Sequence, residues 1–314
     1  MFNSITESVG NTPLVVLNRL AAGLPARIAL KLEFFSPGGS IKDRPALTVI
    51  EEAEKAGALR KGQYVVEKTS GNMGGGLAWV CAVKGYKFIA VLSAGNTPER
   101  SRMIRAFGAR VEIVPQARGG IPGQVSREDL ALVETRTAEL TKKYKAFRPD
   151  QFNNPGSVHA HARGTGPEIW KQTGGQITHF VSFVGSSGTL IGTSKALKKR
   201  NPAIQCFAAE PVHAQFLAGK KVTSTSHKIQ GGGYALKPGI YDDNVVDGTI
   251  AVTDAEAVKM TRLLAAKEGI MGGFSSGANV VAALKLAKKA KRGSLIVTLC
   301  CDTGLKYLST DLYP

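Results

Sequence analysis

A lysine stands at the start of a predicted helix in the segment PGGSIKDRPA, residues 37–46. Apolar residues recur at helical spacing from there to Ala53, which predicts a helix that begins near Ser40. The N-terminal end of a helix carries a partial positive charge, so an ammonium group is unfavourable there. The side chain of Lys42 is therefore either directed into solvent or used in chemistry as an amine that is not a free cation.

Two short segments rich in glycine and hydroxyl residues follow predicted strands. KTSGNMGGG (68–76) and GSSGT (185–189) each precede a predicted helix. Glycines let the backbone approach an anion closely, and the N–H groups at a helix N-terminus point toward it, so GSSGT could hold a phosphate. The alternative is a simple turn between a strand and a helix. The chain has no G-x-x-x-x-G-K-[ST] motif, and GNMGGG does not match the dinucleotide-binding fingerprint.

Alternating strands and helices are predicted around these segments. The first set has strands at 63–67, 87–92 and 110–114 and helices at 74–85, 98–109 and 129–144. The second set has strands at 179–184, 204–210 and 294–299 and helices at 189–200, 263–269 and 277–290. Apolar strands separated by amphipathic helices are typical of parallel sheets covered on both faces. The sets meet near 145–155 and predict two α/β domains, whose ligands bind at the carboxyl ends of the strands.

The composition is that of a globular protein with a basic charge. The 314 residues are 43% hydrophobic and 21% charged, with a formal net charge of +17. No zinc-finger, homeodomain or RNA-recognition motif accompanies the basic runs, so no nucleic-acid function is predicted. The cysteines lack zinc-site spacing, and His159 and His161 have no third ligand at metal-binding spacing, so no metal site is predicted. The sequence shows neither a signal-peptide pattern nor eighteen consecutive apolar residues, and we expect a cytoplasmic protein with no membrane partner.

Several motifs occur in the order found in one enzyme family. They are SVGNTPLVVLNRL (8–20), PGGSIKDRPA, TSGN (69–72), DQFNNP (150–155), GTGPEIW (164–170), GSSGT, HKIQGGG (227–233), GFSSGAN (273–279) and LKYLST (305–310). Together they resemble the fold-type II pyridoxal-phosphate (PLP) enzymes of the cysteine synthase and cystathionine β-synthase family. The resemblance implies two three-layer α/β domains with mostly parallel sheets. The smaller, mobile domain (1–12 and 36–150) would bind the substrate carboxylate, and the larger one (13–35 and 151–314) would bind the PLP phosphate.

The resemblance also assigns roles to individual residues. Lys42 would be the catalytic residue that forms a Schiff base with PLP, Asn72 would bind the phenolic oxygen, and Ser275 would face the pyridine nitrogen. The residues that would bind the phosphate are Gly185, Ser186, Ser187, Gly188 and Thr189. The residues that would contact the substrate are Thr69, Ser70, Gly71, Met73 and Gln151.

A serine opposite the pyridine nitrogen has a chemical consequence. Unlike a carboxylate, its hydroxyl does not keep the nitrogen protonated, so the carbanion is short-lived and loss of a β-leaving group is favoured over transamination. The resemblance therefore implies β-replacement through α-aminoacrylate, with O-acetylserine or O-phosphoserine and sulfide as substrates of a cysteine synthase. It also implies a homodimer and, as a further partner, the tail of serine acetyltransferase in the active site.

Departures from the family pattern leave the leaving group and the nucleophile open. Met73 stands where cysteine synthases usually have threonine, GSSGT replaces the commoner G-T-G-G-T, and residues 231–239 and 300–304 also differ. The alternatives are a β-cyanoalanine synthase, a cystathionine β-synthase-type enzyme that uses cysteine or serine as donor, and a lyase that eliminates sulfide from cysteine. A non-catalytic partner-binding protein is disfavoured because the lysine, asparagine and serine of the family pattern are intact.

Overall fold

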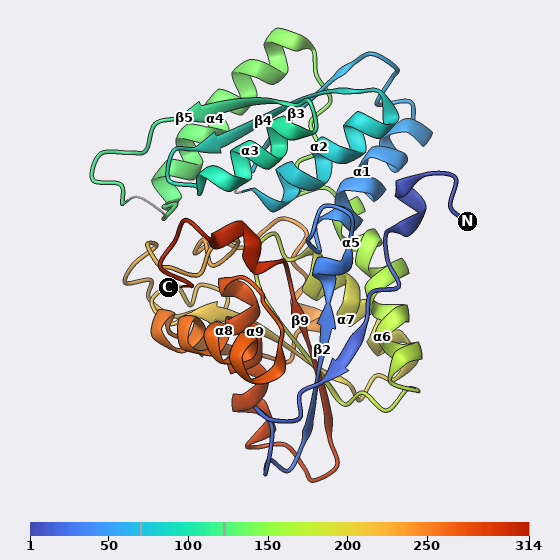
Figure 1. The fold of residues 1–314 in the computed structure, drawn as a ribbon, viewed down its shortest axis with the longest axis vertical. Coiled ribbons are helices and arrows are strands. Elements are labelled where there is room, and N and C mark those ends of the chain that lie inside the picture. The colour runs from blue at the N-terminus through green and yellow to red at the C-terminus, as the bar shows by residue number, and fades with distance from the viewer. Residues whose placement is uncertain (70, 122–123, 314) are drawn as a thin grey trace.

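The computed structural model describes residues 1–69, 71–121 and 124–313 and builds them around two sheets (Figure 1). The strands are β1 (Leu14–Val16), β2 (Arg27–Leu32), β3 (Tyr64–Lys68), β4 (Lys87–Ser93), β5 (Arg110–Val114), β6 (His179–Phe183), β7 (Gln205–Pro211), β8 (Gly248–Val252) and β9 (Leu295–Cys300). The α-helices are α1 (Asp43–Lys55), α2 (Asn72–Lys84), α3 (Pro98–Ala106), α4 (Arg127–Tyr144), α5 (Gly156–Ala160), α6 (Gly166–Gln172), α7 (Gly188–Arg200), α8 (Asp254–Glu268) and α9 (Phe274–Ala287). Short helical turns complete the order: η1 (Ile5–Ser8), η2 (Glu33–Phe35), the π-helical η3 (His161–Thr165), η4 (Asp243–Val245) and η5 (Gly304–Tyr307).

The smaller sheet has the order β3-β4-β5, and all its pairs are parallel. Successive side chains of a strand point to opposite faces, so each strand supplies two cores. Val65 and Ala90 pack in a cluster with residues of α1 and α2, whereas Val66 and Ile89 pack with Val133 of α4. Helices therefore cover both faces of this sheet, with α4 opposite α1 and α2 (Figure 1).

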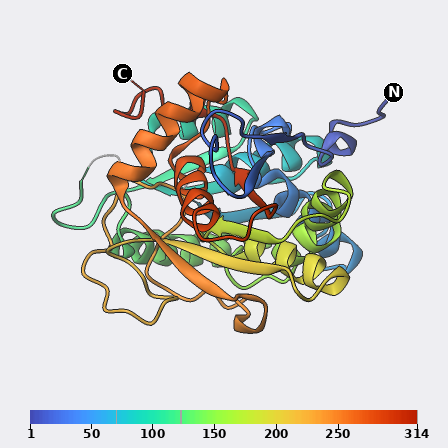
Figure 2. The ribbon, with the colours of Figure 1, turned by 90° about the horizontal axis from the view of Figure 1, so that it is seen from below.

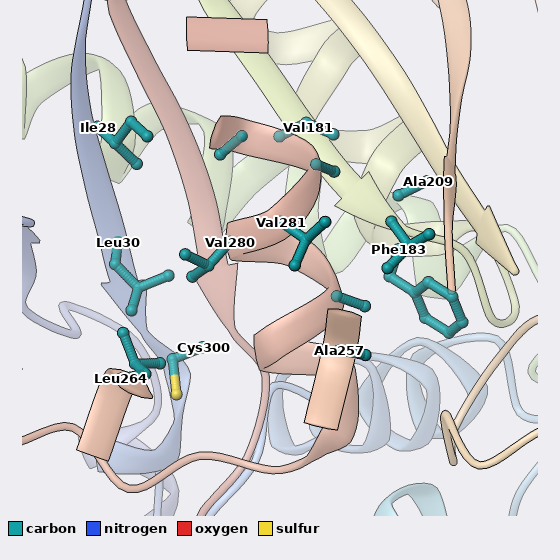
Figure 3. Close-up of a cluster of buried hydrophobic side chains, with 14 of the residues drawn as sticks. Ile28, Leu30, Val181, Phe183, Ala209, Ala257, Leu264, Val280, Val281 and Cys300 are labelled. Atoms are coloured by element: carbon teal, nitrogen blue, oxygen red, sulfur yellow. The ribbon is translucent and has the colours of Figure 1, made fainter. Parts of the chain in front are cut away.

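The larger sheet has the order β1-β2-β9-β6-β7-β8 and is parallel apart from the antiparallel β1–β2 pair. Figure 3 shows Ile28 and Leu30 of β2 and Val181 of β6 in one cluster with Val280 and Val281 of α9. A second cluster includes apolar residues of α6 and α7. Its members on the strands include Ala29, Phe180, Ala208 and Val297. This sheet is therefore also the middle of three layers.

These two sheets confirm the α/β class with mostly parallel strands. All predicted strands and helices are present, with ends shifted by a few residues, except that the helix predicted at 263–269 is the end of the longer α8. The helix predicted to begin near Ser40 begins at Asp43, so Lys42 is its N-cap, and the helix predicted from 74 begins at Asn72. The sequence patterns missed β1, β2, β8 and the short α5 and α6. Among the described helices, none has the length and apolar character that a membrane crossing needs.

The C-terminal segment, residues 301–313, contacts elements packed on both sheets. It runs between the two sheets and beside α8 (Figures 1 and 2), where Arg262 Nε donates to the Leu312 carbonyl at 2.8 Å. On the other side, the Ser309 N–H donates to Glu99 of α3 at 2.8 Å. The segment after the central strand β9 therefore connects the larger sheet to the helices of the smaller one.

Candidate active site

One pocket lies where the segments that follow β3 and β6 meet. Its lining includes residues beside α1, β3 and β6. The predicted site residues that line it are Lys42, Thr69, Asn72, Met73, Gln151 and Ser186. The predicted residues that adjoin these along the chain are Gly71, Gly185, Ser187, Gly188 and Thr189. Ser275 does not line the pocket, and Ser70 lies outside the described residues.

Lys42, the N-cap residue of α1, lines this pocket. Its Nζ makes no hydrogen bond or ion pair with any residue that the structure describes. Burial lowers the pKa of Lys42, although Cys301, Asp302 and Glu33 act in the opposite direction. A neutral amine is the form that acts as a nucleophile or a base. The geometry therefore favours the second of the two interpretations of Lys42, and burial is the largest cause of its reduced proton affinity.

Close packing of α2 holds the backbone at Lys42 in place. A Cβ atom at Gly76 would lie 2.9 Å from the Lys42 carbonyl oxygen, so only glycine lets α2 approach the start of α1 this closely. Two residues further along α1, Arg44 Nε donates to Glu33 at 2.7 Å and Nη1 donates to Glu168 at 2.6 Å. Glu33 follows β2 and Glu168 lies on α6, so a buried ion-pair network fixes the start of α1 against the larger sheet.

The predicted phosphate cradle forms the turn from β6 into α7. Ser187 has a left-handed backbone, with φ of 68°, and caps the 13-residue helix α7, whose first N–H groups have no partners within the helix. The hydroxyl of Ser187 is buried and has no hydrogen-bond partner among the described residues. A Cβ at Gly188 would lie 2.8 Å from the Ser157 carbonyl oxygen, and one at Gly185 would lie 2.5 Å from that of Gly231. An unpartnered buried hydroxyl at a helix N-terminus fits a bound phosphate.

The loop after β3 is shaped by Thr69. Its hydroxyl oxygen accepts hydrogen bonds from the N–H groups of Gly71 and Gly74, both at 2.9 Å, which leaves the hydroxyl proton available to an anion in the pocket. Gly71 has φ of 127°, and a Cβ there would lie 2.2 Å from Cδ of Arg100. The position therefore requires glycine.

Gln151 and Met73 take different places around this loop. Gln151 Nε2 donates to the Lys68 carbonyl at 3.3 Å, so its side chain is held at the end of β3. Met73 is only 2% exposed and packs into the core of the smaller sheet while it lines the pocket. Its thioether makes this wall of the pocket apolar.

Ser275 lies in the first turn of α9, close to the half-buried Cys301. The neighbouring Ser276 hydroxyl accepts the Cys301 N–H at 3.0 Å. Burial raises the pKa of Cys301 to about 11, with Lys42 and a hydrogen bond to Ser275 acting in the opposite direction. Cys301 thus lies near both Lys42 and Ser275, although the sequence singled it out only as part of a divergent segment.

The sequence also missed the role of His161. Its Nε2 lies 3.2 Å from the Thr189 hydroxyl and its Nδ1 lies 2.9 Å from that of Thr165. His159 instead contacts Glu52, so the two histidines do not share a ligand set. Burial, together with the positive charges of Arg44 and Lys42, lowers the pKa of His161 well below its usual value. No local pattern could have revealed a contact between residues on α7 and η3.

Comparisons with known proteins cover nearly the whole chain. A family model described as pyridoxal-phosphate dependent enzyme matches residues 5–302. The chain is 41% identical to cysteine synthase 3 of Caenorhabditis elegans over 98% of this chain and 88% of that one. It is 38% identical to O-ureido-L-serine synthase of Streptomyces lavendulae over 100% of this chain and 93% of the other. A crystal structure of a hydrogen sulfide-producing enzyme from Fusobacterium nucleatum superposes with a TM-score of 0.90, at 39% identity over 98% of this chain and all of the other.

Because these matches cover nearly the whole chain, they include every segment that forms the site. The Lys42 amine, which has no partner in the part of the chain that the structure describes, and the Ser187 cradle also fit the aldehyde and the phosphate of the cofactor that the family carries. The chain therefore belongs to the fold-type II family of pyridoxal-phosphate-dependent enzymes, and pyridoxal phosphate is its cofactor.

Proposed function

We propose that this enzyme catalyses β-replacement on an activated serine, O-acetylserine or O-phosphoserine, with sulfide as the nucleophile and cysteine as the product. One observation carries the proposal: Thr69 and Lys42, whose amine has no partner among the described residues, line the same pocket. An amine that can hold a proton and a site for a carboxylate are the two protein functions that β-replacement on an amino acid requires. The similarity to a cysteine synthase along nearly the full chain supports the same reaction.

The chain's own residues act by moving one proton and by holding two anions. When bound, PLP supplies an electron sink for the bond that breaks at Cα. Nζ of Lys42 takes the proton from the substrate Cα while acetate or phosphate leaves Cβ. After sulfide has bonded to Cβ, Nζ returns the proton to Cα. Thr69, Gly71 and Gln151 would bind the substrate carboxylate and so hold Cα within reach of Lys42.

The remaining side chains would hold the cofactor. Residues 185–189 would bind its phosphate through the N–H groups and hydroxyls at the start of α7. Asn72 would donate to the phenolic oxygen, and Ser275 would face the pyridine nitrogen from α9. The low pKa that burial gives Lys42 supports its role as the proton carrier, because the amine must be neutral when the substrate Cα–H arrives.

The proposal extends to the mobile unit and the assembly. Residues 1–12 and 36–150 would form a smaller domain that closes on the larger one (13–35 and 151–314) and excludes water. The pairing of β2 with β9 supports placing residues 13–35 with the larger domain. A homodimer and a serine acetyltransferase tail that enters the active site rest on the family resemblance alone. The proposed cytoplasmic location rests on the sequence, which shows no signal-peptide pattern.

Met73 supports a second candidate function. Its buried thioether gives the pocket an apolar wall, where a smaller polar side chain would have offered a hydroxyl. Such a wall suits cysteine as the donor, with cyanide, a second thiol or water as acceptor. The similarity to an enzyme named for hydrogen sulfide production supports the same alternative.

A matrix of donors and acceptors tests the two candidates. The PLP-loaded enzyme is incubated with O-acetylserine, O-phosphoserine, serine or cysteine, each with sulfide, cyanide, homocysteine or no acceptor, and the products are identified by mass spectrometry. We expect the fastest reaction to be cysteine formation from one of the two esters and sulfide. Faster turnover of cysteine with cyanide, with homocysteine or with no acceptor would replace cysteine synthesis by the second candidate. Lys42→Ala is the control for background chemistry.

A further inference from the structure

The side-chain amide of Asn72 is held at both ends by the C-terminal segment. Its Nδ2 donates to Oδ2 of Asp302 at 2.7 Å, and its Oδ1 accepts from Nζ of Lys306 at 3.1 Å. Asn72 is the first residue of α2, whereas Asp302 and Lys306 follow β9 in the larger sheet. The contact therefore joins α2, which packs on the smaller sheet, to the segment that follows β9 of the larger sheet.

This pair of contacts fixes which way the amide faces. An asparagine side chain has one acceptor oxygen and an NH₂ group with two donors. In the opposite orientation, the oxygen would meet the carboxylate of Asp302 and the NH₂ group would meet the ammonium of Lys306. An acceptor would then face an acceptor and a donor would face a donor, so two charge-assisted hydrogen bonds would be lost. The observed orientation uses one N–H on Asp302 and leaves the second N–H of Asn72 available to the pocket that it lines.

Lys306 is itself held rigidly. Its side chain is only 5% exposed, and Nζ also donates to the Gly38 carbonyl at 2.9 Å. The N–H of Gly38 in turn donates to Asp43 at 2.7 Å. Burial lowers the pKa of Lys306, and the nearby carboxylates of Asp302 and Asp43 oppose that shift. Lysines are almost never buried unless they are paired, and the partners of this Nζ are the Gly38 carbonyl and the Asn72 amide.

Asp302 is held from the other side. It is fully buried, and its Oδ2 accepts from the hydroxyl of Tyr307 at 2.7 Å. The Tyr307 hydroxyl accepts from Nη2 of Arg100 at 3.0 Å. These contacts tie Asp302 to α3, so neither partner of the Asn72 amide can turn away without breaking buried hydrogen bonds.

We propose that Lys306 and Asp302 are positioning residues that hold the Asn72 amide with one N–H directed at the cofactor. The proposal rests on the assignment of Asn72 to the cofactor in the proposed function. Neither residue touches the reacting atoms; each acts through Asn72.

A double-mutant cycle tests this. Lys306→Met removes the donor while it keeps a chain of similar length, and Asn72→Ala removes the group through which Lys306 is proposed to act. In the parent background we expect Lys306→Met to weaken PLP binding roughly 10-fold, the loss of about one charge-assisted hydrogen bond. It should also shift the absorbance maximum of the bound cofactor. In the Asn72→Ala background the same change should have an effect of less than about 2-fold, because coupled residues are not additive.

Controls separate positioning from general stability. Lys306→Arg keeps a cationic donor and should restore most of the affinity and the parent absorbance. Lys289→Met removes an exposed lysine of the same type and should change neither. If Lys306→Met does not fold, Asp302→Asn tests the other end of the amide by the same cycle.

Two results would overturn the proposal: unchanged cofactor affinity and absorbance in Lys306→Met, or an equal loss in the parent and Asn72→Ala backgrounds. The outcome is independent of which substrates the enzyme turns over, since it is read from the cofactor alone. An inactive parent protein whose cofactor absorbance still responds to Lys306→Met would refute the proposed function and leave the positioning role intact.

Discussion

The imidazole of His161 lies between two threonine hydroxyls, with Nε2 at 3.2 Å from Thr189 and Nδ1 at 2.9 Å from Thr165. The ring is buried and neutral, so it donates a proton through only one of the two nitrogens. Thr189 belongs to the first turn of α7, at the proposed phosphate site. His161 therefore fixes the orientation of a hydroxyl at the proposed phosphate site.

The first prediction follows from that contact. His161→Phe keeps the ring volume but leaves the Thr189 hydroxyl without its partner, and we expect PLP to bind roughly 5- to 10-fold more weakly, as for the loss of one hydrogen bond. Titration of the cofactor-free protein with PLP measures the change. Replacement of His213, an exposed histidine, by Phe is the control and should leave the affinity unchanged. An unaltered affinity in His161→Phe would show that Thr189 needs no support.

His161 also predicts an acid limit to stability. Its pKa is lowered in the folded protein, chiefly by burial, so between that value and the ordinary histidine pKa near 6.5 only the unfolded chain binds the proton. Stability is therefore complete above about pH 6.5 and falls by up to about 1.4 kcal/mol per pH unit below it. We expect the loss in the free energy of unfolding between pH 7.5 and pH 5.5 to be smaller in His161→Phe than in the parent. Equal losses in the two proteins would contradict the assignment.

Local sequence patterns predicted the reactive residues of this site better than the residues that hold them in place. Lys42 and the GSSGT segment could be found because each lies in a short stretch where residue type, spacing and the predicted helix start can be read together. The fold class followed from the alternation of strands and helices. The strand β2 escaped because its partner β9 is more than 260 residues away in the chain, and no local period reports such a pairing.

The contacts of Asn72 with Asp302 and Lys306 could not be predicted from the sequence for the same reason. Asn72 is 230 residues from Asp302, and Lys306 is 234 residues from Asn72, so nothing in either segment indicates the other. A buried lysine and a buried aspartate read as ordinary surface residues in the sequence, because charged side chains are almost always exposed. Only the folded backbone shows that these charges are buried and paired.

Removal of the Ser187 hydroxyl should have different effects on the stability of the cofactor-free protein and on its affinity for PLP. The hydroxyl is buried without a partner in the described residues, so Ser187→Ala should leave the cofactor-free protein as stable as the parent or slightly more stable. The same change removes a donor from the phosphate, and PLP binding should weaken roughly 5- to 10-fold. Thermal unfolding and PLP titration measure the two effects. Ser194→Ala, on the same helix but further from its start, should not alter PLP affinity, and loss of stability without loss of affinity in Ser187→Ala would make GSSGT a simple turn.

The ion pairs of Arg44 should be worth far more than those at the surface. Arg44 and Glu33 are 4% and 0% exposed, whereas Arg163, which pairs with Glu52, is 67% exposed. Arg44→Met leaves carboxylates buried without a counter-charge, and we expect the free energy of unfolding to fall by roughly 3–5 kcal/mol. Arg163→Met should cost less than about 1 kcal/mol. Urea denaturation of both variants measures the two losses. Similar losses would mean that burial does not make the Arg44 ion pairs more important for stability than the surface pair.

The reactive lysine should itself reduce the stability of the cofactor-free protein. Burial lowers the pKa of Lys42, so at neutral pH the folded state holds its proton less tightly than the unfolded chain does. The resulting loss of stability is present below the folded pKa and disappears as the pH rises past the ordinary lysine value near 10.4. Lys42→Met removes the buried amine and keeps its volume, and we expect it to be more stable than the parent at pH 7.

The pH dependence of this difference is the decisive measurement. The gain of Lys42→Met over the parent should shrink as the pH rises above the lowered pKa of Lys42 toward its ordinary value near 10.4, because all other titrating groups are common to both proteins and cancel. Lys289→Met, at an exposed position, should show no gain at either pH. In the same Lys42→Met preparation β-replacement should fall by several orders of magnitude, since the proposed carrier of the Cα proton is gone. A variant that is inactive but no more stable than the parent at pH 7 would show that Lys42 is solvated until the cofactor binds.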